Sequence, residues 1–109
     1  MLVNAVSLLI DKEFSQEQLE KLFSSPDPFA RGLAAWKEYK LNELVHDSNP
    51  YVRMCVIDKY FGLDLLINDE CSAVVEHVQY RLEFVGLTLE EWIEKYPERC
   101  MSTSLFNCK

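Results

Sequence analysis

Hydrophobic residues recur along this chain at the spacing of amphipathic helices, and no segment shows sustained strand-like alternation. After Pro50 the apolar positions are Val52, Cys55, Val56 and Tyr60. A longer stretch, residues 72–85, spaces Val74, Val75, Val78, Leu82 and Val85 in the same way. A further helix is predicted near the N-terminus, from Leu2, Val3, Val6, Leu9 and Ile10. The pattern therefore predicts an all-α protein of about seven or eight helices, some very short.

Polar residues followed by proline mark the starts of two of these helices. Asp27 and Asn49 favour the N-cap position, and the proline that follows each fits the first helical turn, where no N–H is needed. Gly62 is expected to end the helix that begins after Asn49, and Pro97 to close the last helix. A capping-box pattern occurs twice, as Ser15 with Gln18 and as Thr88 with Glu91.

The sequence repeats itself with a period of about 22 residues. The segment from Asp27 to Arg31 aligns with the segment from Asn49 to Arg53. Further on, Leu41, Leu44, Val45 and Asp47 align with Leu63, Leu66, Ile67 and Asp69. A two-helix unit of this size cannot bury its apolar stripe alone, so neighbouring units are expected to stack.

The repeats divide a single domain of 109 residues into unequal parts. We assign residues 1–23 to an N-terminal capping unit and residues 24–70 to two clear repeats. Residues 71–98 form a degenerate third repeat with a C-terminal cap, where the register slips by about four residues. Residues 99–109 are predicted to be a polar tail.

The second repeat contains two short motifs, N-P-Y-V-R at residues 49–53 and G-L-D-L-L-I-N-D-E at residues 62–70. These motifs resemble the HEAT-like, leucine-rich-repeat-variant helical arrays of small Firmicute and phage proteins. The similarity covers residues 24–70 well and residues 71–98 loosely, where Val75 stands in place of the arginine. The resemblance implies a short α-α superhelix that binds other proteins, and it implies no chemistry.

The chain is acidic, with a net charge of −7. Residues 55–109 hold ten acidic and five basic side chains. This balance argues against direct binding to nucleic acid or to an anionic membrane, and it favours a basic protein as partner. Solubility alone is the competing explanation. No apolar run is long enough to span a membrane, and no signal peptide is recognised, so we expect a cytoplasmic protein.

The four cysteines also favour a reducing compartment. They form no CxxC pair, and Cys55 falls among apolar positions, where a reduced thiol packs as a small hydrophobe. A zinc site built from Cys71, His77 and a tail cysteine remains a minor alternative, because the spacing is not diagnostic. We find no catalytic, phosphate-binding or cofactor motif, and we predict neither enzymatic activity nor a cofactor or metal.

Arg31 and Arg53 occupy equivalent positions in the two repeats. We expect a structural ladder, in which each arginine bridges to a carboxylate such as Asp47 or Asp69. An anion-binding pair of arginines is the alternative.

Acidic and aromatic side chains supply the candidates for partner binding. The acidic candidates are Asp64, Asp69, Glu70, Glu90 and Glu94. The aromatic candidates are Trp36, Tyr39 and Tyr51. These three, together with Phe29 and Tyr80, are not easily assigned to one buried face, whereas Phe23, Tyr60, Phe84 and Trp92 fit core positions. Helix capping, a solvated face and packing of a thin core are the competing explanations for these two groups.

Two functions are consistent with these observations. The first is a non-catalytic protein–protein interaction module that binds another protein or a second copy of itself as a homodimer. The second is a phage or mobile-element inhibitor that places an acidic surface in the basic groove of a nucleic-acid-binding defence protein, as anti-CRISPR proteins do. Salt dependence distinguishes them, because an inhibitor of that kind binds steeply more weakly as salt rises.

Overall fold

The computed structural model describes residues 13–101, and every regular element within that range is helical, which confirms the all-α prediction. The elements are α2 (Gln16–Phe23), α3 (Pro28–Trp36), α4 (Leu41–Leu44), α5 (Pro50–Asp58), α6 (Leu63–Leu66), α7 (Ser72–Val85), α8 (Leu89–Lys95) and the 3₁₀ helix η1 (Pro97–Arg99). The helix predicted from Leu2 to Ile10 lies outside the described residues.

The sequence repeat is reproduced in the backbone. Helices α5 and α6 begin and end one period after α3 and α4. Their starts are capped alike, because Asp27 accepts a hydrogen bond from the Phe29 N–H at 3.0 Å and Asn49 accepts one from the Tyr51 N–H at 2.8 Å. The turns between the helices also correspond, with positive φ at Glu38 and Lys40 in one unit and at Tyr60 and Gly62 in the next.

Gly62 has a different role from the predicted one. Helix α5 ends at Asp58, before Gly62, and Gly62 is instead the residue that precedes α6. Its φ of +69° lies in the left-handed region that glycine tolerates best. A Cβ atom there would stand 2.8 Å from Cγ2 of the buried Val45, so the position also needs a residue without a side chain.

The third unit departs from the repeat because its first helix is longer. Helix α7 starts in register with α5, but it continues to Val85 and ends at Gly86, whose φ is +74°. The extra turn moves α8 along the sequence and accounts for the predicted slip in register. The capping boxes predicted at Ser15 and Thr88 are both present and start α2 and α8.

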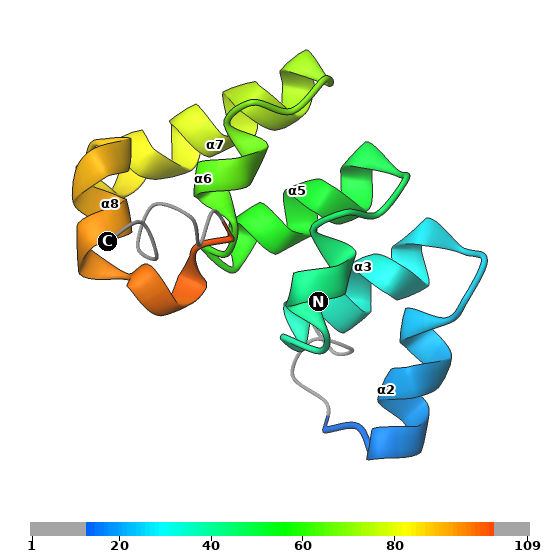
Figure 1. The fold of residues 1–109 in the computed structure, drawn as a ribbon. Helices are drawn as coiled ribbons and strands as arrows, with labels where there is room; N and C mark the ends of the chain where they lie inside the picture. Colours follow the sequence, from blue (N-terminus) through cyan, green and yellow to red (C-terminus); the bar gives the residue numbers. More distant parts are fainter. Residues whose placement is uncertain (1–12, 102–109) are drawn as a thin grey trace, which may run out of the picture.

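The first helices of the three units stack side by side. Helix α5 packs between α3 and α7, with α2 next to α3 at one end and α8 beside α6 at the other (Figure 1). The core lies between these helices and the short α4 and α6. Trp92, with 1% of its surface exposed, is among the largest side chains in it, and Cys55 is a free, buried thiol, as predicted.

Two predictions about the edges of this core are wrong. Phe84 was expected inside, but 70% of its surface is exposed, because α7 extends past the end of α5 at that point. The polar tail does not begin at residue 99 either, since Cys100 is buried and Met101 packs against the core. Within residues 13–101, no helix is both long and apolar enough to cross a membrane.

Candidate functional site

The two repeat arginines form the predicted ladder. Arg31 donates from Nε to Asp47 Oδ1 at 2.8 Å and from Nη2 to Asp47 Oδ2 at 3.1 Å. One period later, Arg53 pairs with Asp69 in the same way, at 2.9 and 3.0 Å. The remaining Nη1 of Arg53 donates to the backbone oxygen of Asp47 at 2.6 Å, which ties one rung to the next.

The carboxylates of the ladder also fix the turns that precede α5 and α7. Asp69 Oδ2 accepts a hydrogen bond from the Cys71 N–H at 2.9 Å, and Asp47 Oδ2 accepts one from the Asn49 N–H at the same distance. Asp64, with 6% of its surface exposed, accepts hydrogen bonds from the Met101 N–H. Asp64 and Asp69 are therefore used inside the fold, which is not the exposed position expected of partner-binding acids.

The other acidic candidates are on the surface. Glu70 lies in the turn before α7, and Glu90 and Glu94 lie on α8; all three are exposed. The structure thus separates the predicted acidic set into two internal carboxylates and three accessible ones. Partner binding by Glu70, Glu90 and Glu94 remains a prediction.

The aromatic candidates divide in the same way. Trp36 is partly buried, with the Lys59 ammonium 5.2 Å from its ring centroid. The Tyr39 hydroxyl donates to Glu20 Oε1 at 2.6 Å and accepts from Gln16 Nε2 at 3.1 Å, which joins the turn after α3 to α2. These contacts within the protein account for the positions of the Trp36 and Tyr39 rings without a binding partner. Tyr51 is different, because 41% of its surface is exposed.

Tyr51 is one of several exposed rings on the first helices of the three units. Across α3 and α5, the rings of Phe29 and Tyr51 meet edge to face, with centroids 5.0 Å apart. On α7, Tyr80 stacks between His77 and Phe84, at 6.3 and 6.5 Å. The exposed fractions are 69% for Phe29, 57% for Tyr80 and 70% for Phe84. We call Phe29, Tyr51, His77, Tyr80 and Phe84 the aromatic face.

An ion-pair cluster ties the α7 part of the aromatic face to α5. Asp58, at the end of α5, accepts from His77 Nε2 at 2.6 Å and from Arg81 Nε at 2.9 Å, and both donors lie on α7. The Arg81 guanidinium lies 5.8 Å from the Tyr80 centroid and 6.0 Å from the Phe84 centroid. The cluster fixes α7 against α5 and holds the cation beside the exposed rings.

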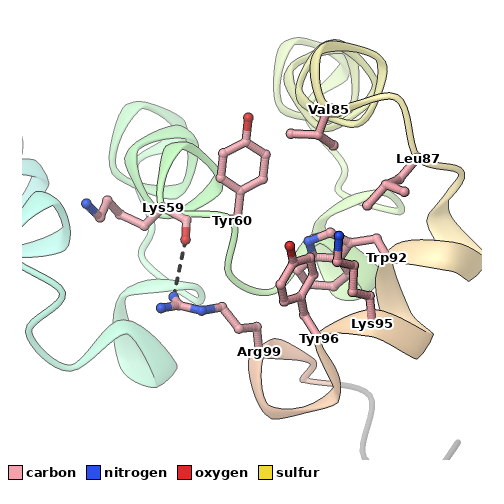
Figure 2. Close-up of a pocket in the computed structure, with 8 residues that line it drawn as sticks. All are labelled: Lys59, Tyr60, Val85, Leu87, Trp92, Lys95, Tyr96 and Arg99. Atoms are coloured by element: carbon pink, nitrogen blue, oxygen red, sulfur yellow. Dashed lines mark hydrogen bonds between the residues drawn. The ribbon is translucent and has the colours of Figure 1, made fainter.

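A pocket of about 380 Å³ lies at the opposite end of α5 from its N-cap. It is formed where the end of α5, the end of α7, α8 and η1 meet, as Figure 2 shows. Its lining is aromatic and apolar with three cations: Lys59, Tyr60, Val85, Leu87, Trp92, Lys95, Tyr96 and Arg99. Three basic side chains around one pocket contrast with the negative charge of the chain as a whole.

The sequence prediction missed this pocket, although one local pattern pointed to it. Trp92, Lys95, Tyr96 and Arg99 follow helical spacing and place two cations and two rings together within an acidic half of the chain. Tyr60 and Val85 come from distant segments, and their approach depends on how far α7 extends. Among residues 13–101, no group of three His, Cys, Asp or Glu side chains is arranged as a metal site.

Comparison with known families, characterised proteins and solved structures gives no significant match to this chain. The resemblance to HEAT-like arrays therefore stays a prediction from the sequence motifs.

Proposed function

We propose that this protein is a non-catalytic interaction module that binds another protein through the aromatic face. The observation that carries the proposal is the exposure of Phe29 and Phe84, each more than two thirds accessible, on the two helices that flank α5 in the stack. Isolated apolar residues are common on protein surfaces, but several large rings grouped together mark interaction sites more often.

The rings are held in place by the fold, which favours binding. Tyr51 packs over α3, where a Cβ atom on Gly32 would come within 2.8 Å of Tyr51 Cε2. Tyr80 is stacked between two neighbours on its own helix. A ring that is already ordered loses little conformational entropy when a partner covers it, so more of the burial energy becomes affinity.

The accessible acids support a basic partner. Glu70, Glu90 and Glu94 are exposed and the chain carries a charge of −7, so association with a positively charged protein is accelerated at low salt. If the exposed acids alone account for binding, the alternative function is favoured, in which the protein is a phage-type, anti-CRISPR-like inhibitor that fills a basic groove of its target. The reduced thiols of Cys55, Cys71 and Cys100 support a cytoplasmic location for either function.

Site-specific photocrosslinking tests the proposal. We replace Phe84 with a photoreactive benzoylphenylalanine and, as a matched control, replace the exposed Glu17 of α2 in the same way. Irradiation of the source cells is expected to join the Phe84 variant to one protein that the Glu17 variant does not capture. A product of twice the chain mass would identify that protein as a second copy.

The captured protein is then purified and its affinity measured across a salt series. Phe29→Ser with Phe84→Ser is expected to weaken binding at least about tenfold at every salt concentration, because the lost contacts are apolar. Identical crosslinking from both positions, or unchanged affinity of the double variant, would overturn the proposal. Binding that vanishes at high salt and ignores the aromatic substitutions would favour the inhibitor instead.

A further inference from the structure

The pocket between α5, α7, α8 and η1 has the composition of a site for a small organic anion. Its walls are mostly rings and apolar side chains, with Tyr60 and Val85 on one side and Trp92 and Tyr96 on the other (Figure 2). The volume of about 380 Å³ falls in the range of small-molecule sites. Flat apolar walls favour a planar body, because rings stack with offset or edge-on contacts.

The three cations in the pocket differ in whether a carboxylate pairs with them. Lys59 and Arg99 share Glu38, with Nζ to Oε2 at 3.5 Å and Nη2 to Oε1 at 3.4 Å. Lys95 has no carboxylate partner among residues 13–101. Glu91 lies one helical turn before Lys95, but its Oε1 accepts from the Thr88 N–H at 2.9 Å and no ion pair with Lys95 is formed.

Lys95 is instead positioned beside an aromatic wall. Its ammonium lies 5.5 Å from the Tyr96 ring centroid, and the Tyr96 and Trp92 centroids are 6.2 Å apart. One shared counter-charge on Glu38 leaves the three cations with an excess of positive charge. The pocket lining therefore favours an anion, in contrast to the net negative charge of the chain.

A second observation also points to a ligand. Trp92 is 1% exposed, and its indole Nε1 is buried with no hydrogen-bond partner. A buried donor without an acceptor costs free energy, and such groups are rare in native proteins. Trp92 lines the pocket, and because its Nε1 has almost no accessible surface, a ligand oxygen would supply the missing acceptor once a neighbouring side chain moves aside.

We propose that this pocket binds a small planar aromatic carboxylate. The ring of the ligand packs against the aromatic walls, and its carboxylate pairs with the Lys95 ammonium and accepts from the indole N–H of Trp92. A neutral amide of the same shape keeps the apolar contacts and loses the charge-assisted pairing. The pocket shares no lining residue with the aromatic face, so its failure would leave the proposed protein interaction untouched.

The test uses the full chain and the probe 2-naphthoate, followed by NMR of the two indole N–H groups. The Trp36→Phe variant assigns the indole signal of Trp92. Saturable shifts of that signal are expected on addition of 2-naphthoate, with affinity at least about tenfold weaker for 2-naphthamide. Lys95 is exposed, so Lys95→Gln is expected to fold normally and to weaken 2-naphthoate binding about tenfold.

Lys21→Gln on α2 is the matched control and should leave the affinity unchanged. Equal binding of the acid and the amide, or equal affinity of Lys95→Gln and wild type, would overturn the assignment to a carboxylate. No saturable shift of the Trp92 signal up to a concentration on the order of 10 mM would overturn the site itself. Tighter binding of a short peptide with a C-terminal phenylalanine would overturn the assignment to a small molecule.

Discussion

The guanidinium of Arg53 and the carboxylate of Asp69 face each other through two parallel hydrogen bonds of 2.9 and 3.0 Å. Arg31 and Asp47 form the same pair one period earlier, and the third donor of Arg53 reaches the backbone of Asp47. The ladder thus links consecutive repeats through charge-assisted bonds. Because equivalent bonds recur once per sequence repeat, they hold the helices of successive repeats at a regular spacing.

Removal of one rung tests how much the ladder stabilises the stack. Arg53→Ala should lower the free energy of unfolding by about 1–3 kcal/mol, because Asp69 would keep a largely buried carboxylate with fewer donors. Arg31→Ala should cost less, since the Arg31 side chain is 17% exposed against 9% for Arg53. Urea denaturation measures both. An unchanged midpoint for Arg53→Ala would refute the structural role.

The two left-handed glycines provide a matched pair of substitutions. Gly86→Ala should cost about 1–2 kcal/mol for the backbone conformation alone, because the space around its missing Cβ is open. Gly62→Ala should cost at least about 1 kcal/mol more, because the new methyl group would collide with buried Val45. Thermal and urea unfolding compare them. Equal losses would show that the Val45 contact relaxes freely.

Helix starts that are set by neighbouring residues could be predicted from the sequence, whereas features that depend on contacts between distant segments could not. Asp27, Asn49 and the two capping boxes act on the next turn of chain, so their positions alone locate helix starts. The exposure of Phe84 depends on how far α7 runs past α5, which apolar spacing does not specify.

The same distinction holds for the candidate sites. The local sequence does not distinguish Asp69 and Asp64 from surface acids. Their hydrogen bonds with Arg53 and with the Met101 N–H show that they lie inside the fold. The pocket joins Tyr60 to Trp92 and Arg99 across the stack, so its walls are not adjacent in sequence.

The buried thiols make stability depend on pH in the alkaline range. Burial raises the pKa of Cys55 from about 9 to about 11, and burial does the same for Cys100. The unfolded chain therefore loses these protons first as pH rises. The contribution of the buried, protonated thiols to the free energy of unfolding is fully present below pH 9 and is lost as pH rises from 9 to 11.

Denaturant titrations at several pH values in the presence of reductant test this dependence. Cys55→Ala should be less stable at neutral pH because of the lost packing, and its stability should fall less steeply than that of wild type between pH 9 and 11. Parallel pH profiles for the variant and wild type would contradict the contribution of Cys55.

The exposed acids of α8 supply the last prediction, a change in association rate. Glu90 and Glu94 are like charges one helical turn apart, and both are accessible. Their mutual repulsion brings no folding benefit, whereas an approaching basic partner would be attracted by both. The double variant Glu90→Lys with Glu94→Lys should stay folded, because neither side chain is buried.

Binding kinetics with the crosslinked partner separate steering from contact. At low salt the double variant should associate more slowly while its dissociation rate stays close to that of wild type, and the difference should shrink as salt screens the charges. The matched control is Glu17→Lys, which reverses one exposed charge on α2 at the far end of the stack. Equal association rates across the salt series would show that α8 does not face the partner, and the aromatic face would then account for recognition.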